Sequence, residues 1–292
     1  MRFSVVIPTL RREEILKETL DSLQSCEPPP FEVIVIDADT GGSAQPVVSA
    51  FDREVSPSVR YVRSPASLTL QRNLGIDDAS GEVLVFLDDD VSIPADVFAR
   101  LERAYRDSEV IGVTGRVVEP DSARRLGPAS ALRRLLPGGG REGTFTRYGY
   151  PRYLRHLDRP RDVEFMQGCF MSARREAAAA VRFDEHMSGY ALAEDEDFSY
   201  RLSRLGRIRY VPEIVVLHGK LGFGSADDRR FGRLVVVNRA YLFRKNFRRT
   251  PLSRAQFALF VAMLVVHRLV NREWRGAQGL LEGAFQVLRG RA

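Results

Sequence analysis

Short runs of apolar residues alternate with longer amphipathic stretches through most of the chain. The short runs are rich in Val, Ile, Leu and Phe and predict strands that are buried on both faces. The longer stretches repeat apolar residues every three or four positions, which predicts helices packed on a core. This order implies an α/β fold with a mostly parallel sheet and helices on both faces. The expected strands are 3–7, 32–36, 59–62, 82–87, 110–118, 163–172 and 211–217, and the expected helices are 13–25, 44–51, 68–78, 95–105 and 194–205.

Two segments depart from this alternation, and both are strongly basic. The chain as a whole has a net charge of +6. Residues 121–161 hold ten arginines and three acidic residues, and residues 229–292 hold fourteen Lys or Arg and two acidic residues. Their charge balances are therefore +7 and +12, which leaves −13 for the rest of the chain. An acidic body with two basic segments suggests a cation site and separate surfaces for phosphate groups or anionic lipid.

The same two segments set the expected domain boundaries. We expect a catalytic domain over residues 1–225, interrupted by a basic loop or lid at 121–161, and a basic helical extension over 226–292. Within the extension, ten apolar residues at 257–266 are fewer than a membrane span needs. They fit a core helix, an interfacial membrane helix or a dimer contact. With only two cysteines in the chain, no disulfide framework is expected and the cytoplasm is the expected compartment.

Three consecutive aspartates, residues 88–90, follow the apolar run 83–87. Ligands of open α/β sheets bind beyond the carboxyl ends of the strands. Adjacent carboxylates repel one another unless solvent or a hard cation relieves them. Thr9, Asp37 and Asp39 also follow strand ends, so we expect all of these side chains along one edge of the sheet. The pattern predicts an anionic, cation-binding edge.

Several motifs, in chain order, resemble those of glycosyltransferase family 2, whose members have the GT-A fold. The resemblance runs over about residues 3–218 and leaves out the basic loop and the C-terminal helices. It implies an inverting, metal-dependent enzyme that moves a sugar from a nucleoside diphosphate to a hydroxyl. The segments that carry it are Ser-Val-Val-Ile-Pro-Thr at 4–9, Val-Ile-Val-Ile-Asp at 33–37, Arg-Asn-Leu-Gly at 72–75, Leu-Asp-Asp-Asp at 87–90, the acidic segment 189–202 and Val-Leu-His at 216–218.

The resemblance also implies roles at the nucleotide end of the site. Pro8 and Thr9 would meet the nucleobase, and Asp37 would accept a hydrogen bond from a base N–H. The family often has Asp-Asp or Asp-Asn and then Gly-Ser here, whereas this chain separates Asp37 from Asp39 by an alanine. Asp39 would therefore share the role of Asp37. Arg72 would either neutralise the diphosphate or brace the aspartates.

At the reacting end, the resemblance implies a metal and a general base. Asp88 and Asp90 would hold Mn²⁺ or Mg²⁺, with the imidazole of His218 either a further ligand or a structural group. The metal would act as a Lewis acid on the departing nucleoside diphosphate. Asp195 begins a helix, whose dipole favours an ionised carboxylate, and it would take the proton of the acceptor hydroxyl. Glu194 would orient this base or touch the sugar. Asp89 and Gly168 complete the expected donor-binding set.

Other function classes remain open at this point. A sugar-phosphate nucleotidyltransferase shares the architecture but would need a glycine-rich phosphate loop after the first strand, where residues 8–12 contain no glycine. A non-enzymatic protein that binds membrane or nucleic acid would explain the arginines but not the aspartates. We expect a nucleotide-sugar donor, UDP-sugar first, and a glycan or lipid-linked acceptor, with no nucleic-acid partner. The C-terminal extension is expected either to bind an anionic membrane surface or to form a homodimer.

Overall fold

The computed structural model describes residues 1–51, 57–119, 140–154, 157–187, 191–219 and 228–290, and the chain divides into two compact units. The first unit comprises Met1–Pro120 and Leu154–Lys220, and the second comprises Asp121–Tyr153 and Leu221–Ala292. The described part of the predicted basic loop from residue 140 to Tyr153 thus belongs to the second unit, with the C-terminal helices. Its residues 121–139 and 155–156 lie outside the described residues.

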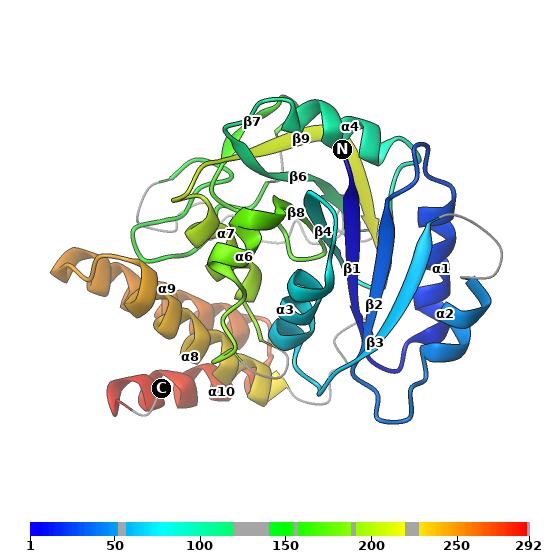
Figure 1. Cartoon of the computed structure of the whole chain (residues 1–292). Helices are drawn as coiled ribbons and strands as arrows, with labels where there is room; N and C mark the ends of the chain where they lie inside the picture. The colour runs from blue at the N-terminus through cyan, green and yellow to red at the C-terminus, as the bar shows by residue number, and fades with distance from the viewer. Residues whose placement is uncertain (52–56, 120–139, 155–156, 188–190, 220–227, 291–292) are drawn as a thin grey trace. The chain divides into compact units, whose positions relative to one another are not determined.

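A mixed sheet forms the frame of the first unit (Figure 1). Its strands follow the order β3-β2-β1-β4-β8-β6-β9-β5, with β7 paired to β9. The first four strands in this order run parallel, as the sequence predicts, whereas β8 runs antiparallel to β4 and β6. The strands are β1 (Phe3–Thr9), β2 (Glu32–Asp37), β3 (Ser58–Arg63), β4 (Val83–Leu87), β5 (Val91–Ser92), β6 (Val110–Val118), β7 (Arg161–Val163), β8 (Phe170–Arg174) and β9 (Arg207–His218).

Helices cover both faces of this sheet, and alternate residues of each strand point to opposite faces. In β1, Val5 and Ile7 join one core cluster, while Val6 joins the other. The first cluster packs under α1 (Glu13–Gln24), α2 (Gln45–Phe51) and α4 (Val97–Tyr105), and the second packs under α3 (Leu68–Asp78), α6 (Arg175–Val181) and α7 (Glu194–Leu202). The fold class is therefore as predicted, an α/β sheet with flanking helices.

Helix α3 lies unusually close to β1 because of Gly75. A Cβ atom added at Gly75 would lie 2.2 Å from Cγ1 of Val6, far inside van der Waals contact. The glycine therefore lets the helix backbone approach the strand directly. This approach places the residues of the first half of α3 next to the carboxyl ends of β1 and β4, where the functional site lies.

The prediction of one continuous strand over 163–172 is wrong. Two separate strands, β7 and β8, flank the non-strand segment 164–169, and the two strands pair with different neighbours. The intervening chain turns at Gln167, whose carbonyl accepts a hydrogen bond of 3.0 Å from the backbone N–H of Phe170. The turn brings Gly168 towards the start of α7, a tertiary contact that local periodicity does not encode.

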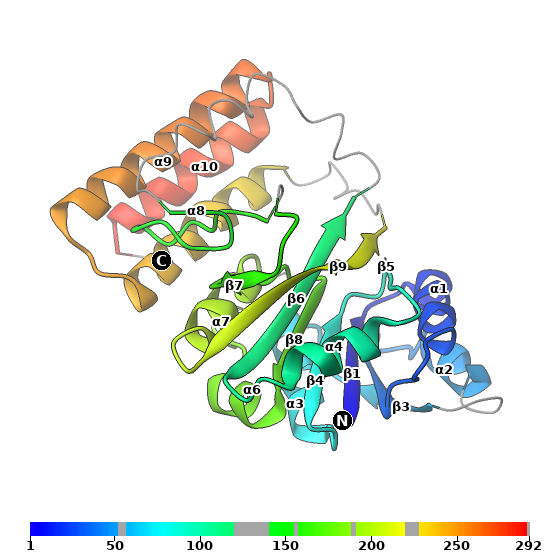
Figure 2. The same cartoon turned by 90° about the horizontal axis from the view of Figure 1, so that it is seen from above.

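The second unit contains three long helices, α8 (Asp228–Asn246), α9 (Pro251–Val270) and α10 (Trp274–Leu288) (Figure 2). Helix α10 packs against α8 through glycines: a Cβ added at Gly279 would lie 1.9 Å from the backbone oxygen of Arg229. Helix α9 starts at Thr250, whose Oγ1 accepts a hydrogen bond of 3.1 Å from Ser253 N. Tyr148, Phe243 and Phe260 form a small aromatic core within this unit.

Helix α9 is longer than the predicted apolar run at 257–266. Of the helices in the described ranges, it is the one whose 20 residues are long and apolar enough to cross a membrane by length and composition. The apolar run is shorter than the helix because the polar residues Gln256 and His267 flank it, with Arg254 and Arg268 just beyond them. These arginines lie near the two ends of α9, where charged side chains can reach a polar surface.

Candidate active site

The carboxyl ends of β1, β2 and β4 meet at one edge of the sheet and bring the predicted polar side chains together. Thr9 and Asp37 are register partners at the ends of β1 and β2. Oγ1 of Thr9 donates a hydrogen bond of 2.7 Å to Oδ2 of Asp89, which follows β4. The ends of β1 and β4 are therefore joined by side chains and those of β1 and β2 by strand pairing, at the edge where open α/β sheets bind ligands.

At the β2 end of this edge, Asp37 and Asp39 have different surroundings. Asp37 is fully buried: its Oδ1 accepts a hydrogen bond from Asp39 N, and its Oδ2 accepts from Ala44 N and from the Tyr61 hydroxyl. Asp39 pairs with the exposed Arg11, whose Nε lies 2.8 Å from Oδ1. The hydrogen bond from Arg11 lowers the pKa of the Asp39 carboxyl. Asp37 therefore shapes the loop that carries Asp39, and Asp39 is the carboxylate next to the solvent-exposed Arg11. Pro8 is buried within β1.

Sequence reasoning missed Gln71, which fixes the same strand ends. Its Nε2 donates hydrogen bonds of 3.1 Å to the carbonyl of Thr9 and 2.7 Å to the carbonyl of Ile36. The side chain thereby links the carboxyl ends of β1 and β2, where the hydrogen bonds between the two strands end. Gln71 directly precedes the motif that begins at Arg72, and this adjacency was the one available signal.

The three consecutive aspartates have three different roles. Asp88 is partly exposed, and its Oδ1 accepts a hydrogen bond of 3.1 Å from Nη2 of Arg72. Asp89 is buried against Thr9 and Arg12, and desolvation raises the pKa of its carboxyl. Asp90 faces His218, with 3.2 Å between Oδ1 and Nε2. The middle aspartate, Asp89, is thus bonded to β1 and the residues after it, whereas Asp88 and Asp90 lie near His218.

Asp88, Asp90 and His218 form a group that fits a divalent cation. One ligand atom from each residue lies within 4.8 Å of the others. Oδ1 of Asp90 is buried and lies 3.2 Å from Nε2 of His218, so a cation bound by both residues would replace the proton between them. Two carboxylates with one imidazole are a donor set that suits Mn²⁺, and Mg²⁺ through the carboxylates. The neighbouring carboxylates of Asp90 and Glu119 raise the pKa of His218 to about 10.

Arg72 lies beneath the site, with 1% of its surface exposed. Its Nη1 donates to Oε1 of Glu194 over 2.5 Å, and its Nη2 donates to Oδ1 of Asp88 and to the carbonyl of Gly168. The guanidinium also lies over the ring of Phe183, 5.2 Å from its centroid. Of the two roles that the sequence left open for Arg72, this geometry favours bracing the aspartates over contact with a diphosphate.

Glu194 and Asp195 begin α7, but only one of them is accessible. Glu194 is buried, whereas Asp195 is partly exposed. Oδ2 of Asp195 accepts a hydrogen bond of 2.9 Å from Gly168 N, and its Oδ1 accepts one of 2.8 Å from Glu196 N. These N–H donors and the helix terminus favour the ionised carboxylate. Burial and the negative charge of the neighbouring Asp195 raise the pKa of Glu194, and the single positive charge of Arg72 only partly offsets them.

Gly168 offers a test of how tightly the Asp195 carboxylate is held. A Cβ at this position would lie 3.2 Å from both Cβ and Oδ2 of Asp195, so Gly168→Ala must displace that side chain by a few tenths of an ångström. We expect turnover to fall by about tenfold, because small errors in the placement of a reacting group are costly. Steady-state kinetics measure the loss of turnover. The dissociation constant of the donor and the melting temperature of the protein should change little.

Gly206→Ala is the matched control. Its added Cβ would lie 3.0 Å from side-chain atoms of Ile111, at the starts of β6 and β9, whereas His218 lies at the far end of β9. Equal losses of activity in the two variants would show that crowding alone, and not the position of Asp195, is responsible.

Comparisons with known proteins show the family and the fold of this chain. The sequence model of the family described as glycosyl transferase family 2 matches residues 4–182. The amylovoran biosynthesis glycosyltransferase AmsB of Erwinia amylovora is 30% identical over 220 residues, covering 70% of this chain and 64% of AmsB. The succinoglycan biosynthesis protein ExoM of Rhizobium meliloti is 34% identical over 121 residues, covering 40% of this chain and 39% of ExoM. The chain thus spans less than two thirds of the length of these curated relatives.

Solved structures share the fold at low sequence identity. The mannosyltransferase PcManGT from Pyrobaculum calidifontis, in complex with GDP-Man and Mn²⁺, superposes with a TM-score of 0.63 at 15% identity, covering 100% of this chain and 88% of its own. Residues 1–349 of S. aureus TarS, in complex with UDP, superpose with a TM-score of 0.59 at 15% identity, covering 89% of this chain and 71% of that chain. Both likenesses place the chain among GT-A glycosyltransferase structures.

Proposed function

The chain belongs to glycosyltransferase family 2, and on that premise we propose that it transfers a sugar from a nucleoside diphosphate to a hydroxyl, with inversion at the anomeric carbon. One observation carries the proposal: Arg72 bonds both Asp88, a member of the cation-fitting group, and Glu194, which precedes Asp195. A donor site and a general base thus share one buried support. The match to the family covers the strand-end motifs and favours this reading over a sugar-phosphate nucleotidyltransferase.

The proposed donor is a UDP-sugar. Thr9 and Asp39 border the nucleotide end of the edge, and Asp37 acts there through the loop that it holds. TarS, which is similar in fold, was solved with UDP and with UDP-GlcNAc, while PcManGT was solved with GDP-Man. Gln167 is proposed to bind a hydroxyl of the donor sugar, since its Oε1 is buried and accepts no hydrogen bond from the part of the chain that is described.

Asp88, Asp90 and His218 would hold Mn²⁺ or Mg²⁺. When bound, the cation would supply positive charge to the diphosphate of the leaving group. The fit rests on the close approach of the three ligand atoms and on the mixed carboxylate and imidazole donors. Mn²⁺ accompanies the nucleotide in PcManGT and in GalNAc-T7, both of similar fold.

Asp195 is the proposed general base. Its carboxylate takes the proton from the acceptor hydroxyl as that oxygen attacks the anomeric carbon and the bond to the nucleoside diphosphate breaks. The backbone N–H groups of Gly168 and Glu196 hold the carboxylate in place. Glu194 does not reach solvent, so its proposed role is to fix Arg72 and the start of α7 rather than to accept the proton.

The proposed acceptor is a glycan or a lipid-linked glycan in the assembly of a cell-envelope polysaccharide, on the cytoplasmic side of the membrane. The names of similar proteins support this class. They include polysaccharide-biosynthesis proteins and a Campylobacter jejuni glucosyltransferase named for an acceptor on undecaprenol pyrophosphate, which is 30% identical over 94 residues. The sugar itself is not part of the proposal.

A thermal-shift panel of UDP, dTDP, GDP and CMP, each with and without Mn²⁺, tests the proposed donor. A ligand that binds only the native state raises the melting temperature by mass action. We expect a Mn²⁺-dependent rise with UDP that exceeds the rise with the other nucleotides. A larger rise with GDP would correct the nucleobase, and no rise with any nucleotide would overturn the proposed function.

Mn²⁺ affinity is expected to increase with pH. The pKa of His218 is raised to about 10, and binding through Nε2 requires that nitrogen to lose its proton. In the metal-free protein, the stability contributed by protonated His218 is fully present below the unfolded pKa of about 6.5 and is lost as pH rises towards 10. Calorimetry with Mn²⁺ and UDP at several pH values between these limits should show an increase of up to about tenfold per pH unit.

His218→Gln provides the control for this pH dependence. The variant keeps Asp88 and Asp90 but has no imidazole proton to displace, so its Mn²⁺ affinity should be weaker and nearly independent of pH in the same range. A flat profile for the unaltered protein would show that His218 is not a ligand.

A further inference from the structure

The outer face of α9 is apolar along its whole length. Exposed residues recur at helical spacing, and they include Leu252, Leu259, Val266 and Leu269 with alanines between them. Leu259 alone leaves 51% of its surface in solvent. Of the exposed residues of this helix, Arg254 is the one that carries a charge. Large exposed apolar patches are uncommon on soluble proteins and mark surfaces that contact something.

The opposite face of α9 is also apolar, and the protein covers it. Phe260 is buried against Phe243 and Tyr148, and Phe257 and Leu264 pack against the same cluster. The two faces of one helix thus have separate partners: the inner face has the aromatic core of its own unit, and the outer face has none among the described residues. A helix held along one side in this way can lie in a membrane interface.

Helix α10 repeats the arrangement. Its inner face meets α8 through small residues such as Gly279 and Gly283. Its outer face exposes Trp274, Leu281 and Phe285 at helical spacing, and Phe285 leaves 53% of its surface in solvent. Trp274 is the single tryptophan of the chain, and it stands at the start of the helix. Exposed tryptophan beside basic residues is typical of membrane-interface segments.

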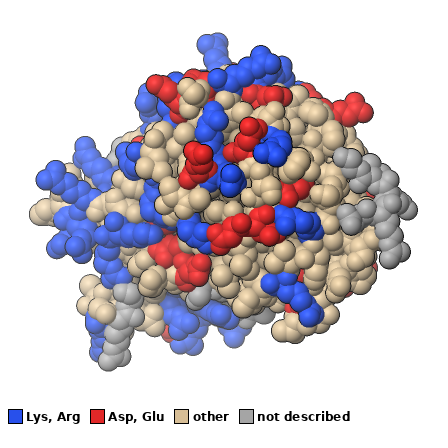
Figure 3. All heavy atoms as spheres, in the orientation of Figure 1, with Lys and Arg blue, Asp and Glu red and all other residues tan. Residues whose placement is uncertain are grey.

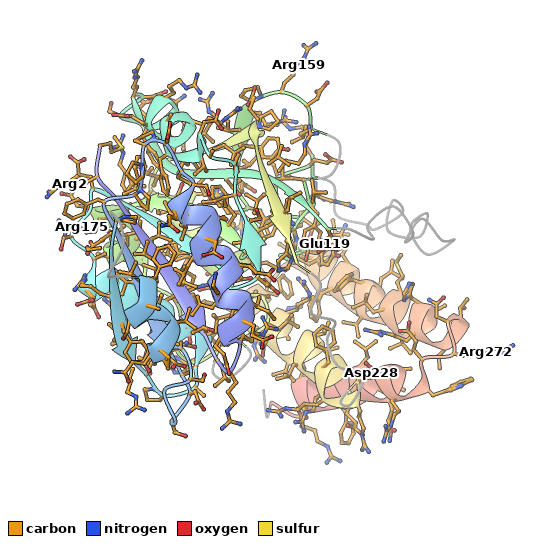
Figure 4. All side chains as sticks on the ribbon, turned by 90° about the vertical axis from the view of Figure 1, so that its right-hand side faces the viewer. Arg2, Glu119, Arg159, Arg175, Asp228 and Arg272 are labelled. Carbon is orange, nitrogen blue, oxygen red and sulfur yellow. The ribbon has the colours of Figure 1, made fainter. Side chains whose placement is uncertain are left out.

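The charges around these faces are almost all positive. Between residues 248 and 289 the chain holds seven arginines and two glutamates. The glutamates are neutralised within the unit, since Glu273 pairs with Arg268 and Glu282 pairs with Arg229. Figure 3 shows Lys and Arg gathered over the helices of this unit, and Figure 4 shows Arg272 projecting from the turn between α9 and α10. The arginines therefore present positive charge next to the apolar faces.

We propose that the outer faces of α9 and α10 dock the protein on an anionic lipid bilayer, with the apolar side chains in the interface and the arginines on the lipid headgroups. Apolar area and arginine charge act together in such binding, and each headgroup contact adds to the attraction. A second copy of the chain fits this surface less well, because a symmetric contact would bring the same arginines of both copies together. A membrane-spanning α9 would lose the packing of its own Phe260 against Phe243 and Tyr148.

Vesicle flotation of the full chain tests the proposal. Vesicles of phosphatidylcholine are compared with vesicles that contain phosphatidylglycerol, each at low and high salt. We expect at least tenfold stronger binding to the anionic vesicles at low salt, and loss of most of this preference at high salt. Equal binding to both lipids, or no binding to anionic vesicles at low salt, would overturn the proposal.

Substitutions on the outer faces provide matched variants. Leu259→Ser with Phe285→Ser removes exposed apolar groups from α9 and α10, and we expect at least tenfold weaker vesicle binding. Leu205→Ser is the control, because Leu205 is an equally exposed leucine, 58% in solvent, in the first unit. The melting temperatures of these variants, and the rise in melting temperature caused by UDP with Mn²⁺, should not change. Weaker vesicle binding would then be due neither to unfolding nor to loss of the proposed donor site.

Two further outcomes would assign the surface differently. Light scattering of the protein without lipid would detect a dimer, and a dimer that the double variant abolishes, without vesicle binding, would assign the face to a second copy. Resistance of the vesicle-bound protein to high-salt and alkaline washing would indicate a spanning helix. Either result would overturn docking in the plane of the membrane.

Discussion

Replacing Asp195 by asparagine is expected to lower kcat by about a thousandfold, the range in which general bases contribute. The amide has nearly the size of the carboxylate, and its oxygen can still accept the hydrogen bond from Gly168 N. It cannot take a proton from the acceptor hydroxyl. The donor affinity, measured by calorimetry with UDP and Mn²⁺, should stay within about twofold, because the loss lies in proton transfer.

Glu196→Gln is the control for this substitution. It removes one negative charge from the same first turn of α7 and so reproduces the change in helix-terminus electrostatics. We expect its kcat to remain within a few-fold of the unaltered protein. Near-normal turnover of Asp195→Asn would mean that another group accepts the proton, and a loss of donor binding would place Asp195 in the donor site.

Replacing Arg72 by methionine is expected to lower the free energy of unfolding of the first unit by about 3–5 kcal/mol. Methionine fills much of the volume but leaves Glu194 buried without its cation and removes a donor from Asp88 and from the Gly168 carbonyl. Urea unfolding followed by circular dichroism measures the loss. The one tryptophan, Trp274, lies in the second unit and would report on other helices.

The cause of this loss can be separated from simple loss of packing. Without Arg72, the pKa of Glu194 rises further, and a raised carboxyl pKa contributes stability at low pH that is lost as pH increases. The pKa of Glu194 is already about 8 with Arg72 in place, so the part of the Arg72→Met deficit that comes from Glu194 should shrink as pH falls towards 8. Adding Glu194→Gln to this variant should restore part of the stability, because no unpaired charge is then buried.

Arg100→Met is the control, because it measures how much stability is lost when an ordinary, partly exposed ion pair is removed. Arg100 bonds Asp96 at the start of α4, and both side chains are partly exposed. Its loss should cost about 0.5 kcal/mol. A similar small cost for Arg72→Met would show that the buried network does not stabilise the fold.

Local pattern was enough to predict the parallel half of the sheet. Strands buried on both faces need continuous apolar runs, and a helix packed on a core needs apolar residues every three or four positions. The observed bounds of β1 to β4 and of α3 therefore lie within a residue or two of the predicted ones. The order of the motifs then placed the polar strand ends on one edge. The basic charge of the C-terminal segment and its apolar run were equally visible in the sequence.

The direction of β8 and the break in the predicted strand 163–172 were not predictable in the same way. Strand direction depends on which neighbours a strand pairs with, and β8 pairs with β4 and β6, far away in sequence. The burial of Arg72 likewise depends on Glu194, 122 residues further along the chain. From the sequence, a basic residue on a helix next to aspartates could either contact a diphosphate or brace the aspartates, and only its partners decide between the two roles.

By itself, the sequence of this protein determined which residue types meet at the strand ends, because apolar period and chain order are local properties. The tertiary structure decided what each of them does. It buried Asp37 and Asp89, joined Asp88 and Asp90 to His218, and left Asp195 partly exposed beside Gly168. It also decided that one face of α9 is covered and the other is not. Burial is the physical reason, since it depends on contacts between segments that no single stretch of sequence contains.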